Sequence, residues 1–249
     1  MKSLHISVAP EAIFHLGPLT VTNSLLTSII VMLVLIFISL KATDVKNHKT
    51  KTKISSFVEM VVEGFYGFFK GILGEAIDKL FPLLFTFFAF IIVSNWIGLF
   101  PGVGPIGIWE EGRDGKVLVP LLRGPNADLN TTISLAIISV VVTQIMSIKA
   151  LGIAGYLKRF FNIRNPINLV VGILELISEV SKLISFSFRL FGNIFAGEVL
   201  LAVMTFLVPV LVPVPFLGLE VFVWFIQALV FTMLTSIFIV VATEHHEGG

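Results

Sequence analysis

The chain has 249 residues, of which 56% are hydrophobic and only 13% charged, and its mean hydropathy is +0.99. Water-soluble domains are much more polar, so this composition indicates an integral membrane protein. A formal net charge of +1 with no dense basic run argues against nucleic acid as a partner, and the lack of cysteine excludes disulfides, thiolate metal sites and cysteine nucleophiles.

Intervals without charge predict where the chain crosses the membrane, because a bilayer core of about 30 Å needs roughly 20 apolar residues in a helix. Residues 55–79 instead mix acidic residues and lysine with aromatic residues, which predicts an amphipathic helix in the interface. Proline residues within 209–215 force a turn between the last two long helices, which we expect to form a long hairpin. The sequence therefore predicts an all-α polytopic membrane protein, a single membrane domain over 1–249 with five spans at about 20–40, 81–100, 130–148, 168–207 and 217–243.

The loops differ in their content of lysine and arginine, which predicts orientation in the membrane. Loop 41–53 holds five such residues and loop 149–164 holds four, whereas loop 101–128 holds three and the N-terminal segment one. This distribution places the N-terminus outside and loop 41–53 inside. Five spans then place the C-terminus in the cytoplasm.

Two cations, Lys182 and Arg189, lie inside the long predicted span 168–207. An arginine at the centre of a membrane helix costs on the order of 2.5 to 3.5 kcal/mol, so another group must offset it. At 100° per residue Glu198 faces away from Arg189, and we expect the counter-charge on another helix or another subunit. One polar face is shared by Glu175, Lys182, Ser185, Arg189 and Asn193.

The last predicted helix carries Glu220 and Gln227, which are seven residues apart and share a face. Carboxylates bind and release protons, while arginine keeps its charge, so polar faces on two adjacent helices suit the movement of a small ion. Structural alternatives are also open. Lys182 and Glu179 could extend to the inner interface, Gln227 could serve only as an interhelical hydrogen bond, and Glu175 could be solvated at an aqueous mouth.

The run SFSFRLFGNIFAGE at 185–198 resembles the signature of subunit a of the rotary F-type ATP synthases. Three further runs resemble elements of the same family: SNWIGLFPG at 94–102, GPNADLNTT at 124–132 and IQALVFTMLT at 226–235. The four runs follow the family's order, and the resemblance covers residues 20–246.

The resemblance implies that Arg189 faces the ion-binding carboxylates of a rotating c-ring and prevents ions from short-circuiting between two offset half-channels. It implies that the path from the outside includes Glu198, Glu220, Asn193 and Gln227, with Asp128 near its start. Glu175 and Ser185 would lie on the path to the inside.

The implied partners are the c-ring, the peripheral-stalk b subunits and membrane lipid, in the cell membrane. The coupling ion is either H⁺ or Na⁺. The resemblance implies no catalytic site, cofactor or metal in this chain. The sequence also lacks a glycine-rich loop with lysine that would bind nucleotide.

The sequence departs from the family pattern in two places. Glu220 stands where many members have histidine, so either Glu198 or Glu220 could be the main relay. Residues 103–124 have no clear counterpart in the family.

The competing hypothesis is a stand-alone secondary ion transporter or channel, which needs a substrate site enclosed by this chain. A purely structural scaffold would leave the cost of Arg189 unexplained.

Overall fold

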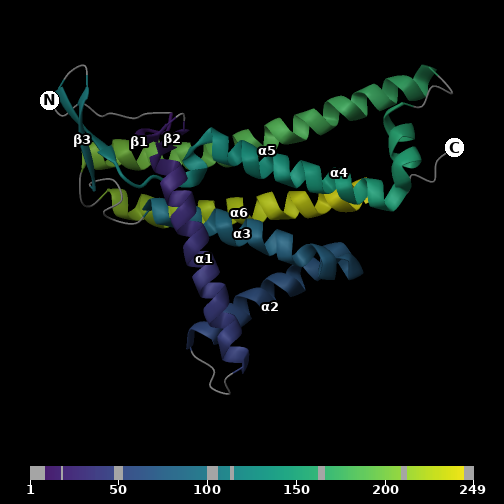
Figure 1. The fold of residues 1–249 in the computed structure, drawn as a ribbon, viewed down its shortest axis with the longest axis horizontal. Helices are drawn as coiled ribbons and strands as arrows, with labels where there is room; N and C mark the ends of the chain where they lie inside the picture. The colour runs from purple at the N-terminus through teal and green to yellow at the C-terminus, as the bar shows by residue number, and fades with distance from the viewer. Residues whose placement is uncertain are drawn as a thin grey trace.

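The computed structural model describes residues 9–17, 19–47, 53–99, 106–112, 115–161, 166–208 and 212–243. In this part of the chain, six α-helices follow one another and two short β-hairpins are added (Figure 1). The helices are α1 Asn23–Asn47, α2 Lys53–Leu73, α3 Ile77–Leu99, α4 Leu129–Phe160, α5 Pro166–Leu207 and α6 Pro213–Thr243.

Five segments are long and apolar enough to cross a membrane, which confirms the predicted class of an all-α polytopic membrane protein. They are Asn23–Ala42, Ser55–Leu99, Leu129–Phe160, Ile167–Leu207 and Pro213–Thr243. The second segment contains both α2 and α3, separated by a single 3₁₀ turn, Gly74–Ala76, at which Gly74 has a φ of 55°. The location of 55–79 in the interface stays a prediction.

Two β-hairpins, which hydropathy did not indicate, precede helices α1 and α4. Strand β1 (Ala12–Leu16) pairs antiparallel with β2 (Leu19–Thr22), and β3 (Gly107–Gly112) pairs antiparallel with β4 (Gly115–Pro120). Much of loop 103–124 is thus a hairpin. Both hairpins lie at the left of Figure 1, and we call this the hairpin end of the molecule.

Helices α3 to α6 form the packed body of the protein. Helix α5 lies along α4, and α6 packs against α3, α4 and α5. Aromatic rings fill the centre, where Phe231 of α6 contacts both Phe87 of α3 and Phe186 of α5. Helix α1 crosses the direction of these helices in Figure 1 and leaves large apolar side chains such as Leu33 and Phe37 exposed. Such a surface is suited to lipid rather than water.

Helix α4 bends sharply at Gly152, whose φ of 71° and ψ of 162° are essentially restricted to glycine. The residues after the bend, 153–160, turn toward the start of α5 at the right of Figure 1, and we call them the elbow segment. A second glycine, Gly172 of α5, lies against the end of this segment. A Cβ at Gly172 would come within 2.8 Å of the carbonyl carbon of Phe160.

We predict that Gly172→Ala lowers stability by about 1 to 3 kcal/mol, because backbone atoms of Phe160 cannot move aside as a flexible side chain can. The matched control is Gly218→Ala in α6, where a new Cβ meets nothing within 4 Å. Alanine there should be neutral or slightly stabilising. Thermal unfolding midpoints in detergent compare the two variants, and equal midpoints would contradict the prediction.

Candidate functional site

Arg189 lies at the surface of α5, near the middle of the helix. A row of side chains spaced by four residues on a different face of α5, Phe186, Leu190 and Ile194, is buried in the core, and the face with Arg189 is exposed. The Nη2 atom of Arg189 donates a hydrogen bond to the Oγ atom of Ser185, at 3.2 Å. No carboxylate in the described part of the chain forms an ion pair with Arg189. This agrees with the angular spacing in the sequence.

One turn toward the hairpin end, Asn193 joins α5 to α6. Its side-chain amide donates a hydrogen bond to the Oε1 atom of Gln227, which is buried. The interhelical hydrogen bond considered for Gln227 is therefore present. It also brings the polar face of the last helix to within one turn of Arg189.

Glu220 of α6 is 5% exposed and lies directly against Gly197 of α5. A Cβ at Gly197 would come within 2.6 Å of the Glu220 carboxyl carbon, so only glycine leaves room for this side chain where it is. The Oε2 atom of Glu220 has no hydrogen-bond partner, nor has Nε1 of the buried Trp224 one turn later. Buried polar atoms without a hydrogen-bond partner cost free energy, so their occurrence at two residues one turn apart calls for an explanation.

Glu198 forms an ion pair with Arg123, whose Nε and Nη2 atoms both lie 3.5 Å from Oε2. Arg123 stands on the loop between β4 and the 3₁₀ turn Pro125–Ala127. This loop is held in place because the Arg123 backbone N–H donates to Thr27 of α1 and its Nη1 atom donates to the carbonyl of Ala9.

The sequence analysis did not single out Arg123. Its partner Glu198 is 75 residues away in the chain, and periodicity within a helix cannot show such a contact. The one signal available was its position directly before the run GPNADLNTT.

Asp128 is buried at the start of α4. Its Oδ1 atom accepts a hydrogen bond from the backbone N–H of Asn130 and thereby caps the helix, while Oδ2 accepts one from the Oγ atom of Ser24 at 2.7 Å. Close by, Asn126 donates to the Oδ1 atom of Asn95. The runs 94–102 and 124–132 therefore meet at the hairpin end.

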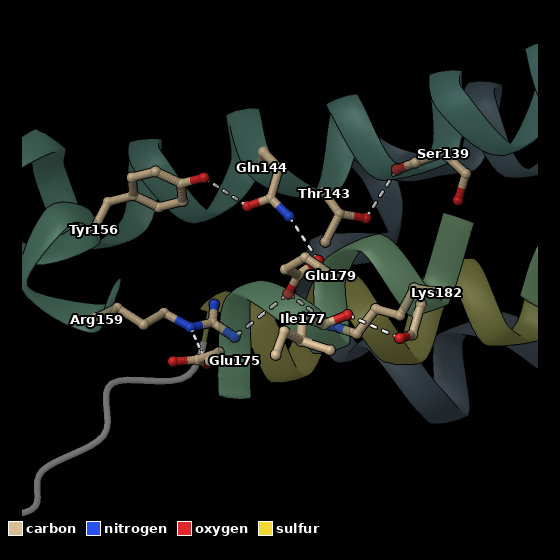
Figure 2. A network of polar contacts seen from close by, with 10 residues as sticks. Ser139, Thr143, Gln144, Tyr156, Arg159, Glu175, Ile177, Glu179 and Lys182 are labelled. Carbon is tan, nitrogen blue, oxygen red and sulfur yellow. Dashed lines mark hydrogen bonds and ion pairs between the residues drawn. The ribbon is translucent and has the colours of Figure 1, made fainter. Parts of the chain in front are cut away.

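At the elbow end four charged side chains gather, as Figure 2 shows: Arg159 of α4 with Glu175, Glu179 and Lys182 of α5. The Lys182 ammonium lies 2.7 Å from Oε1 of Glu179, and these side chains are only 17% and 10% exposed. Lys182 and Glu179 thus neutralise each other, and the alternative that they extend to the inner interface stays open. Glu175 is paired with Arg159 and its side chain is 22% exposed, so the alternative that it lies at an aqueous mouth also stays open.

Polar side chains on and beside α5 thus lie on both sides of Arg189 along the helix axis. Toward the hairpin end lie Asn193, Gln227, Glu198 and Glu220, with Asp128 beyond them, and toward the elbow end lie Ser185 and Glu175. Within the described ranges, no three His, Asp or Glu side chains gather so as to hold a metal ion.

The fold and these residues define a multi-pass helical membrane protein with ionisable side chains distributed along its packed helices. A family sequence model described as "ATP synthase A chain" matches residues 25–240. The chain belongs to this family, the ATP synthase a subunits.

Individual relatives support the same assignment. The ATP synthase subunit a of Moorella thermoacetica is 33% identical over 232 residues, which are 93% of this chain and 95% of the relative. The protein of the same name from Gloeobacter violaceus is 32% identical over 246 residues, with coverage of 97% and 92%. That from Citrifermentans bemidjiense is 33% identical over 216 residues, with coverage of 87% and 85%.

We predict that Asp128→Ala destabilises the hairpin end by about 2 to 4 kcal/mol. The variant loses the cap of α4, typically about 1 kcal/mol, and the charged acceptor of the buried Ser24 hydroxyl, about 1.5 to 3 kcal/mol, which leaves Ser24 only its 3.1 Å contact with the Thr22 hydroxyl. Asp128→Asn keeps one acceptor oxygen and should lose less than half as much. Thermal unfolding of both variants in detergent is the measurement, and an alanine variant as stable as the parent would show that these bonds do not hold the site.

Proposed function

We propose that this chain is the ion-translocating stator subunit of an F-type ATP synthase, with two offset half-channels that carry H⁺ or Na⁺ to and from the carboxylates of a c-ring. Membership of the family supports the role of a membrane subunit of the synthase, with ion transport and ATP synthesis as its context. The observation that carries the detailed proposal is the exposed mid-helix Arg189, which has no carboxylate partner in the described part of the chain.

The guanidinium of Arg189 would act as a fixed positive charge at the rotor surface. Arginine stays protonated at any physiological pH, so a ring carboxylate that arrives opposite Arg189 releases its ion and pairs with the guanidinium. The same charge repels a cation that would otherwise pass directly between the half-channels. The pairing would also offset the cost of placing arginine in the bilayer.

The outer half-channel would run along the hairpin side of Arg189. Glu198 and Glu220 would relay the ion, and Asn193 with Gln227 would carry it the last turn to the ring. Support comes from the contact between Asn193 and Gln227 and from the unpaired carboxylate oxygen of Glu220. Asp128 would support the outer mouth by fixing α4 against α1.

The inner half-channel would run from Ser185, one turn from Arg189, toward the elbow end. Glu175 would contribute negative charge near the inner mouth, where it is paired with Arg159. A membrane potential of 100 mV supplies only about 2.3 kcal/mol per ion, so several ions would have to pass for each ATP.

In this proposal the chain is non-catalytic and works with the c-ring and the b subunits of a peripheral stalk. It lies in the cell membrane with its N-terminus outside and its C-terminus in the cytoplasm, as the loop charges predict. Exposure of Arg189 at the protein surface favours a site completed by a partner over one enclosed by this chain.

We predict that Arg189→Ala abolishes ATP-driven ion pumping by the assembled synthase and raises passive ion leak through its membrane sector, because the barrier between the half-channels is lost. Inverted membrane vesicles with a pH-sensitive dye, or with ²²Na⁺ for a sodium-coupled enzyme, measure both quantities. Lys149→Ala, which removes an exposed cation of α4, is the matched control and should pump normally. Normal coupled pumping by Arg189→Ala would rule out the mechanism.

A second prediction concerns Arg123. Arg123→Gln should slow ATP-driven pumping by about threefold to tenfold without raising the leak, because Glu198 loses its cationic partner while the Arg189 barrier stays intact. Arg123→Lys retains the charge and should preserve most of the rate. A leak as large as that of Arg189→Ala would instead place Arg123 in the barrier itself.

A further inference from the structure

The polar cluster at the elbow end, formed by Arg159, Glu175, Glu179 and Lys182, has a net formal charge of zero (Figure 2). Glu179 is its centre. One carboxylate oxygen, Oε1, lies 2.7 Å from Lys182 Nζ and 3.7 Å from Arg159 Nη2, and the other, Oε2, accepts a hydrogen bond from Gln144 at 2.8 Å. Every side chain of the cluster is at least three-quarters buried.

Helix α5 carries two cations, Lys182 and Arg189, and they share one face of the helix. They are seven residues apart, which is about 10 Å along the axis. The two cations differ in pairing and in exposure. Lys182 is neutralised by Glu179 and its ammonium lies 4.8 Å from the centre of the Phe238 ring, whereas Arg189 is exposed and bonded only to a serine among the described residues.

We propose that Glu179 is a positioning residue that cancels the charge of Lys182, so that ring carboxylates meet a single positive charge on α5. This inference rests on the proposed function, since it assumes that carboxylates of a partner pass along this face. An uncompensated Lys182 would form a second attractive position for an ionised carboxylate, about 10 Å from Arg189. A ring carboxylate held at Lys182 would release its ion before the ring had turned to the position opposite Arg189, and this would delay rotation.

The elbow segment supplies the remaining partners of the cluster. The bend at Gly152 and the close contact of Gly172 with Phe160 bring Arg159 against α5, where it balances Glu175. Glu179 is then free to neutralise Lys182. Tyr156 of the same segment donates to Gln144 and so orients the amide that binds Glu179.

The test is a double-mutant cycle in the assembled synthase, with ATP-driven pumping in inverted vesicles as the readout. Glu179→Gln keeps the shape of the side chain but leaves Lys182 unpaired, and we expect pumping to fall about tenfold, the effect of one unit charge at 10 Å in a medium of effective dielectric about 20. The double variant Glu179→Gln with Lys182→Gln restores the charge balance and should recover at least half of the parent rate. Lys182→Gln alone should pump nearly as fast as the parent, because Arg159 and Gln144 still hold Glu179.

A structural role would give a different pattern. If the double variant is as slow as Glu179→Gln, or if Glu179→Gln pumps normally, the proposal is overturned. Glu179→Asp should retain pumping because it retains the charge. Gln144→Leu removes two hydrogen bonds, one to Glu179 and one from Tyr156, and no charge, so it should also pump normally, and a tenfold loss there would show that the cluster acts through packing. These variants keep Arg189, so their passive leak should stay low, and failure of this inference is distinguishable from failure of the Arg189 barrier.

Discussion

The positive charge of Arg189 in the middle of an apolar helix is the constraint around which α5 is organised. Such a charge costs on the order of 2.5 to 3.5 kcal/mol in a bilayer unless it is paired. The buried row Phe186, Leu190 and Ile194 fixes the rotation of α5 against the core and so keeps Arg189 outward. Other charges of α5 have partners within the chain: Glu198 is paired with Arg123, and the elbow cluster is neutral. Arg189 stands apart, and in the proposed function a partner supplies its counter-charge.

The two ends of the molecule secure α5 in different ways. At the hairpin end, Arg123 pairs with Glu198 of α5, and hydrogen bonds between sequence-distant motifs next to Arg123 hold that region together: Asp128 binds Ser24, and Asn126 binds Asn95. At the elbow end, close backbone contact and ion pairs do it, since a bend in α4 brings Arg159 to the start of α5. Buried ion pairs add little net stability but are costly to break, so the elbow cluster serves geometry and charge balance more than folding energy.

Much of this arrangement was predictable from local pattern. Hydropathy indicates five crossing segments, and the angular spacing of α5 places Arg189 apart from Glu198, because both properties depend only on neighbouring residues. Contacts between distant segments were not predictable. The pairing of Arg123 with Glu198 needs the loop after β4 to fold back on α5, and the pairing of Arg159 with Glu175 needs the bend at a single glycine. The short β-hairpins give too weak a pattern for hydropathy to detect.

The two sides of Arg189 differ chemically, and in the proposed function this difference separates the two ion paths. On the hairpin side, the antiparallel α6 contributes Glu220, whose buried carboxylate has an unpaired oxygen, and Gln227, which contacts Asn193. On the elbow side, α4 contributes an arginine, and the carboxylates of α5 are held by cations. A carboxylate with an unpaired oxygen is suited to bind and release an ion, whereas a fully paired one is suited to hold a constant field. Because the polar residues of α6 contact α5 on the hairpin side of Arg189 and the elbow segment contacts it on the other side, a single helix carries both environments with one fixed charge between them.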